Sequence, residues 1–158
     1  TWSSVDLIGE SNLFIVRSMT KDYALAGLRL GYGIAGESII TVLNKVKSPW
    51  NVSSIAQKAG IYVLNNEPYL ETCRTRIKES RSFLIESLKE LGLNLLPSQT
   101  NFFLVKVGNA TAFRQALVKK GILVRDCASF GLPSYIRLAT RTIDECRKLI
   151  AAIKETGV

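Results

Sequence analysis

The stretch LFIVRSMTKDYALAGLRLGYGIA, residues 13–35, decides the fold. Its β-branched and aromatic residues predict two strands, at residues 13–17 and 28–35, and the more polar segment between them predicts a turn. Helical patterns follow on the C-terminal side of the second strand. Strands that alternate with helices in this way indicate an α/β protein.

Lys21 lies in the predicted turn, three residues after Ser18 and eight residues before Arg29. A lysine amine can form a Schiff base with an aldehyde cofactor. A hydroxyl and a guanidinium at this spacing can hold the phosphate of such a cofactor. A surface lysine after a core strand is the simpler interpretation of Lys21 alone, but Ser18 and Arg29 favour a cofactor site with Lys21 as its catalytic residue.

After residue 35, the sequence predicts two helices at residues 37–46 and 52–64 and a long third helix at residues 66–91. Asn66 can cap this long helix, and Gly92 ends it. The remaining predicted elements are strand 102–107, helix 111–120, strands 122–125 and 135–139, and a last helix opened by the capping box Thr142-Ile143-Asp144-Glu145.

The composition excludes several classes of protein. The net charge of +8 comes from 21 basic and 13 acidic residues, without the basic run that would indicate nucleic-acid binding. No apolar run approaches the ~20 residues that span a membrane. Arginines inside apolar strands instead indicate a small anionic substrate. The chain does not begin with Met, so we expect it to start inside a longer protein.

The cysteines indicate a reducing compartment. Cys73, Cys127 and Cys146 are widely spaced, and the chain has no histidine, so a zinc site is not expected. We expect the three cysteines to be reduced, core-filling residues of a cytoplasmic protein.

Arg137 is the second strong signal. It alternates with Ile136 and Leu138 in a predicted strand, so its side chain lies on the opposite face from theirs. A guanidinium in mid-strand is costly to desolvate unless it meets an anion, and its planar fork suits a carboxylate. Arg125 ends the neighbouring predicted strand and supports the same interpretation. A solvated outer face of an edge strand is the alternative.

Two motifs suggest other enzymes but are incomplete. Gly31-x-Gly33-x-x-Gly36 matches the dinucleotide-binding fingerprint, but no acidic residue occurs between Glu37 and Glu67 to bind a ribose. Ser18-x-x-Lys21 matches the motif of penicillin-recognising enzymes, but the S-x-N and K-[ST]-G motifs that complete their site are absent.

Four ordered blocks instead resemble one enzyme family. They are PWNVS (residues 49–53), PSQTNF (97–102), GILVRDC (121–127) and FGLPSYIR (130–137). With the Lys21 segment they resemble the fold-type I pyridoxal-phosphate enzymes, in particular the histidinol-phosphate aminotransferases and the related threonine-phosphate decarboxylases of cobalamin biosynthesis. The resemblance extends from about Ser11 to Ile153.

The resemblance implies a role for each candidate residue. Lys21 would carry pyridoxal 5'-phosphate, and the hydroxyl and arginine beside it would hold the cofactor's phosphate. Arg137 would bind the α-carboxylate of the substrate, and Arg125 would bind the substrate's phosphate. Asn101 would lie near the substrate, with its role left open.

The resemblance also implies a domain organisation. Residues 1–65 would be the tail of the large pyridoxal-phosphate domain, residues 66–91 an interdomain helix, and residues 92–158 a small C-terminal α/β lobe. Members of the family are longer, and several cofactor contacts lie upstream of the lysine. We therefore expect this chain to be the C-terminal part of a homodimeric enzyme and to be inactive by itself.

One departure bears on the reaction. The aminotransferases usually have glycine four residues after the carboxylate-binding arginine, and this sequence has Arg141 there, as in Arg141-Thr142. This position favours a threonine-phosphate decarboxylase, with histidinol-phosphate aminotransferase as the alternative and a non-catalytic interaction module as the remote one. Together with Arg125 and Arg137, Arg141 also predicts a substrate with more than one anionic group.

Overall fold

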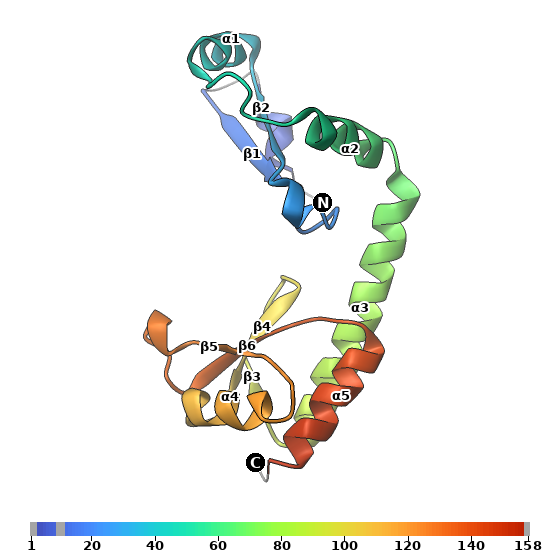
Figure 1. Ribbon diagram of the computed structural model, residues 1–158, viewed down its shortest axis with the longest axis vertical. Coiled ribbons are helices and arrows are strands. Elements are labelled where there is room, and N and C mark those ends of the chain that lie inside the picture. The colour runs from blue at the N-terminus through green and yellow to red at the C-terminus, as the bar shows by residue number, and fades with distance from the viewer. Residues whose placement is uncertain (1–2, 9–11, 157–158) are drawn as a thin grey trace. The chain divides into compact units, whose positions relative to one another are not determined.

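The computed structural model describes residues 3–8 and 12–156. The chain divides into two compact units, Thr1–Glu71 and Thr72–Val158, and the division falls within helix α3 (Glu67–Glu90) (Figure 1). Both units combine strands with helices, which confirms the α/β class. The domain limits expected from the sequence remain a prediction.

The first unit is built on an antiparallel hairpin of β1 (Phe14–Ser18) and β2 (Gly31–Ala35) (Figure 1). The second strand is shorter than predicted. A 3-10 helix at Ala26–Leu28 occupies its expected start, and Arg29 adopts the left-handed conformation with φ of 53°. The backbone therefore turns before it becomes extended. A further 3-10 helix at Ser4–Leu7 was not predicted.

Two helices complete this unit, α1 (Glu37–Val46) and α2 (Ser54–Leu64). The first has the predicted limits. The second begins two residues later than predicted, because Ser53 acts as its N-cap and its side chain accepts a hydrogen bond from the N–H of Ala56 at 3.2 Å.

A small core joins α2 to the hairpin. Met19, Leu30 and Ala56 are buried, with exposed fractions of 2%, 9% and 1%. Gly60 is needed at this contact, because a Cβ there would lie 2.5 Å from Cδ2 of Leu30. This packing holds the turn that carries Lys21 against α2.

The second unit contains a four-stranded antiparallel sheet with strand order β3-β4-β6-β5. The strands are β3 (Asn94–Leu95), β4 (Phe102–Lys106), β5 (Arg125–Asp126) and β6 (Tyr135–Ala139). The remaining elements are α3, α4 (Ala110–Val118), α5 (Ile143–Lys154) and a 3-10 helix at Ala128–Phe130 (Figure 1). Buried residues of β4, β6 and the three helices form one core. Because side chains alternate along a strand, Arg137 lies on the sheet face opposite the buried Ile136 and Leu138.

The predicted strand at residues 122–125 is wrong except at its last residue. After α4, Gly121 adopts φ of 76°, and the N–H of Ile122 donates to the carbonyl of Leu117 at 3.0 Å. The segment therefore closes the end of α4, and β5 pairs with β6 only at Arg125 and Asp126. Strand β6 has the predicted limits, and the capping box that opens α5 is confirmed. Strand β3 was not predicted.

No helix in the described ranges has the length and apolar character needed to cross a membrane. Residues 3–8 and 12–156 also contain no group of three or more potential metal-binding side chains.

Candidate active site

Lys21 lies in a turn whose backbone is held on both sides. The N–H of Ala24 donates to the carbonyl of Lys21 at 3.0 Å, and Ala24 itself has φ of 55°. Just before the turn, the N–H of the buried Met19 donates to the carbonyl of Leu30 at 3.1 Å. The Lys21 side chain is exposed, so the turn presents its amine to solvent.

Ser18 lies at the end of β1, opposite Gly31 of β2. Its hydroxyl lies 2.8 Å from that of Thr20 and accepts a hydrogen bond from the N–H of Thr20 at 3.3 Å. Thr20 is therefore a further candidate for phosphate binding, which the sequence interpretation missed. The available signal was a second hydroxyl residue next to the lysine, in the sequence Ser18-Met19-Thr20-Lys21.

Arg29 lies two residues before Gly31, at the same end of the hairpin as Ser18. Its Nη1 donates to the carbonyl of Ala26 at 3.1 Å, which anchors the guanidinium to the 3-10 helix. A left-handed conformation costs a residue with a side chain roughly 1–2 kcal/mol. Such strain is concentrated at functional sites, and here it occurs at the residue expected to bind phosphate.

The donors at this end of the hairpin fit a phosphorylated aldehyde. The hydroxyls of Ser18 and Thr20 and the guanidinium of Arg29 are groups that bind phosphate oxygens. The amine of Lys21 is the group that reacts with an aldehyde. All four residues come from the β1–β2 connection and the adjoining strand end, so one local structure presents both kinds of chemistry.

The second cluster of candidate residues lies in the sheet of the second unit. Arg125 of β5 is directly opposite Arg137 of β6. The guanidinium of Arg125 lies 5.1 Å from the ring centre of Phe130, and that of Arg137 lies 5.1 Å from the ring centre of Phe102. Nη2 of Arg125 also donates to the hydroxyl of Ser129 at 3.0 Å. Like charges directly opposite each other in a sheet are destabilising, so this pair favours an anionic ligand.

Both arginines line a cavity of about 670 Å³. Its walls are the segment 121–125, residues 137–139 of β6 and one side of α5. Its charged lining residues are Arg114, Arg125, Arg137, Arg141, Lys148 and Glu145. Asn101 is not among the lining residues. Its carbonyl accepts a hydrogen bond from the N–H of Thr140 at 2.8 Å, so its role at the site stays a prediction.

Glu145 is the acidic residue of the cavity lining. Hydrogen bonds from Arg141 and then from Thr142 lower the pKa of its carboxyl from 4.5 to about 2. Glu145 is therefore ionised at neutral pH.

The thiols of the second unit are not arranged for chemistry. Cys127 and Cys146 are buried, and burial raises the pKa of both thiols. The Cys146 thiol donates a weak hydrogen bond to the carbonyl of Arg141, with a sulfur–oxygen distance of 3.7 Å. Cys127 and Cys146 therefore act as packing residues, as expected, whereas Cys73 is only half-buried and is not part of the core.

Residues 2–153 match the family described as aminotransferase class I and II. A histidinol-phosphate aminotransferase from Akkermansia muciniphila is 37% identical over 144 residues, which are 91% of this chain and 40% of that protein. The chain thus spans less than half the length of this curated relative.

Two solved structures share the fold. A histidinol-phosphate aminotransferase from Sinorhizobium meliloti, in complex with pyridoxal-5'-phosphate, is 29% identical with a TM-score of 0.78, over 96% of this chain and 44% of that one. An L-threonine-O-3-phosphate decarboxylase from Porphyromonas gingivalis is 25% identical with a TM-score of 0.81, over 98% of this chain and 50% of that one.

Proposed function

Because this chain belongs to the class I and II aminotransferases, we propose that it supplies the cofactor-attaching lysine and the substrate-binding arginines of a pyridoxal-phosphate-dependent enzyme. Its substrate would be a phosphorylated amino acid or amino alcohol. The observation that carries the proposal is the grouping of Ser18, Thr20, Lys21 and Arg29 at one end of the β1–β2 hairpin.

Each of these residues has a distinct task. Ser18, Thr20 and Arg29 would donate hydrogen bonds to the cofactor's phosphate, and Lys21 would attach covalently to its aldehyde carbon. When bound, pyridoxal phosphate supplies an electron sink next to the substrate Cα. The amine of Lys21 would then move a proton to or from the substrate, as a general acid–base group.

The arginines of the second unit would orient the substrate. Arg137 would bind a carboxylate through its planar fork, and Arg125 would bind the phosphate. Stacking on Phe102 and Phe130 holds both guanidinium groups in place. Loss of a proton from the substrate would lead to amino transfer, and loss of CO₂ would lead to decarboxylation.

Histidinol-phosphate aminotransferase is the function with the better support. Relatives with this name are similar over 90% or more of the chain. The comparisons therefore favour the alternative of the sequence interpretation over its main choice, decarboxylation of threonine phosphate. That decarboxylase remains a second candidate, because Arg141 departs from the aminotransferase pattern and one solved structure of similar fold carries that name.

The test gives the enzyme that contains this chain two substrates in separate reactions. Histidinol phosphate with 2-oxoglutarate should yield glutamate, and O-phospho-L-threonine should release no CO₂. Release of CO₂ without glutamate formation would establish the second candidate. Absence of both products, with no cofactor bound, would support the non-catalytic module instead.

Assembly and location are part of the same proposal. The enzyme would be a homodimer, as the resemblance implies, and sedimentation of the enzyme that contains this chain tests that state. Free thiols at Cys73, Cys127 and Cys146 support a reducing, cytoplasmic location.

A further inference from the structure

The cavity of the second unit carries more positive charge than the described residues neutralise. Its lining has five cationic side chains and one acidic side chain. Arg114, Arg125, Arg137 and Lys148 take part in no salt bridge within residues 3–8 and 12–156. A concave surface of one charge sign concentrates ligands of the opposite sign. The cavity therefore favours small anions.

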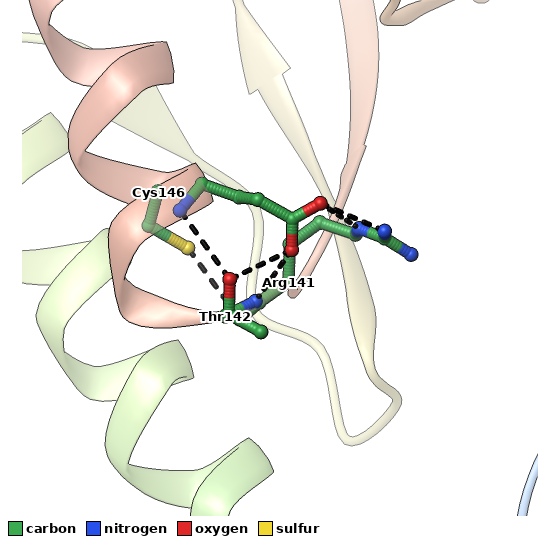
Figure 2. A network of polar contacts seen from close by, with 4 residues as sticks. Arg141, Thr142 and Cys146 are labelled. Carbon is green, nitrogen blue, oxygen red and sulfur yellow. Dashed lines mark hydrogen bonds and ion pairs between the residues drawn. The ribbon is translucent and has the colours of Figure 1, made fainter.

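Glu145 fixes the orientation of the remaining cation, Arg141. Nε and Nη2 of Arg141 donate to Oε1 of Glu145 at 3.2 and 2.8 Å. Oε2 of Glu145 accepts from the backbone N–H and the hydroxyl of Thr142 at 3.2 and 2.7 Å (Figure 2). Both oxygens of the carboxylate are thus engaged. Within the part of the chain that the structure describes, Nη1 of Arg141 makes no hydrogen bond, so it is available to a ligand.

A second ion pair, within α5, provides a comparison. Nη1 of Arg147 lies 3.0 Å from the carboxylate of Asp144, and the Arg147 side chain is 65% exposed, against 69% for Arg141. Exposed pairs of this kind contribute little to stability. Arg147 stacks on Phe83 and does not line the cavity, whereas Arg141 does. The two arginines are similarly exposed and each pairs with one carboxylate, but only Arg141 faces the cavity.

We propose that Arg141 is a third anion-binding residue of this cavity, that Glu145 positions it, and that the pair selects ligands carrying both a phosphate and a carboxylate. The inference rests on one part of the proposed function, the assignment of Arg125 and Arg137 as the first two anion-binding residues. It favours the second candidate, the threonine-phosphate decarboxylase, because histidinol phosphate carries no carboxylate. A phosphate monoester carries about −2 at neutral pH and a carboxylate adds −1. The distinctive contribution of Arg141 is its orientation, because its guanidinium is held by Glu145 at the cavity wall while Nη1 stays open to a second anionic group of such a ligand.

The first experiment titrates the 158-residue chain with O-phospho-L-threonine and, separately, with inorganic phosphate. Binding is followed through the backbone amide NMR signals of residues 121–125 and 137–149. Arg141→Ala should weaken O-phospho-L-threonine roughly fivefold or more, since a charge-assisted hydrogen bond is lost. It should weaken inorganic phosphate less than the two-group ligand. The matched control, Arg147→Ala, removes the same charge and one exposed ion pair outside the cavity, and should leave both affinities unchanged. Equal losses in the two variants would overturn the proposal.

The second experiment separates positioning from charge with Glu145→Gln. Glutamine also completes a capping box, so the start of α5 is retained. Loss of the carboxylate makes the cavity more positive, which by charge alone strengthens anion binding. Loss of the ion pair frees the guanidinium of Arg141, which weakens binding if its position matters. We expect weaker binding of O-phospho-L-threonine, and tighter binding would refute the role of Glu145.

Neither experiment depends on turnover. An inactive enzyme whose cavity shows this selectivity would contradict the proposed function alone. An active enzyme whose Arg141→Ala variant keeps wild-type selectivity would contradict this inference alone.

Discussion

Replacement of Arg137 by alanine should damage ligand binding while leaving the fold almost unchanged. The structure gives two opposing contributions to stability. Stacking of the exposed guanidinium on Phe102 stabilises the fold by roughly 0.5–1 kcal/mol. Repulsion from Arg125, directly opposite in the sheet, destabilises it by on the order of 0.2–1 kcal/mol. Because Arg137→Ala removes both, the free energy of unfolding should change by less than about 1 kcal/mol.

The expected loss of ligand-binding free energy is larger than the change in stability, and no opposing interaction offsets it. When a guanidinium pairs with a carboxylate in a desolvated site, its truncation costs on the order of 2–5 kcal/mol of binding free energy. At 1.4 kcal/mol for each tenfold change, the affinity for a carboxylate ligand should fall roughly 30-fold or more. Arg137→Lys should recover only part of it, because the planar fork is lost.

Two measurements on the same variant decide the matter. Chemical denaturation of the 158-residue chain reports the stability change, and 2-oxoglutarate affinity of the enzyme that contains the chain reports the binding change. A stability loss above about 2 kcal/mol with little loss of affinity would mean that Arg137 is a structural residue. Arg147→Ala serves as the control for a general effect of lost charge.

Three further predictions follow from other parts of the structure. Gly60→Val should destabilise the first unit by about 1–3 kcal/mol in denaturant unfolding, because its side chain overlaps Leu30, and unchanged stability would contradict the close packing of α2. The folded-state pKa of Glu145 is about 2, below its usual value of 4.5, so its stabilising effect should be complete above pH 4.5 and decline as the pH falls towards 2. Acid titrations followed by circular dichroism should show this window, and Glu145→Gln should make it smaller without removing it, because the pKa values of Asp126 and Glu155 are also lowered by their hydrogen bonds. Val16 and Ile55 are 72% and 75% exposed, so the 158-residue chain should self-associate, and concentration-independent sedimentation as a monomer would argue against this.

Local patterns were enough to predict most elements of the second unit. Strand β6 shows strict alternation around Arg137, and α5 opens with a capping box that local hydrogen bonds complete. The strand prediction at residues 122–125 was wrong because the apolar character of a segment does not show which groups its backbone will hydrogen-bond. Its first N–H bonds to the carbonyl of Leu117, which leaves only Arg125 of the predicted strand for sheet pairing.

The candidate site was predictable where spacing along the chain determines it. Ser18, Lys21 and Arg29 lie at the same end of one hairpin, and a hairpin is a local structure, although their role as a site stays a prediction. The opposition of Arg125 and Arg137 was not predictable, because it depends on the register between two strands. The dual use of Glu145 was also hidden, since a capping box by itself does not show that the same carboxylate holds Arg141.

The central claim is that Lys21 attaches the cofactor, and site-specific reduction tests it most directly. The enzyme that contains this chain is incubated with pyridoxal phosphate, reduced with borohydride, digested and mapped by mass spectrometry. The account predicts a pyridoxyl label on Lys21 that disappears in Lys21→Ala and persists in Lys58→Ala, which removes another exposed lysine of the first unit. A label on a different lysine, undiminished in Lys21→Ala, would contradict it.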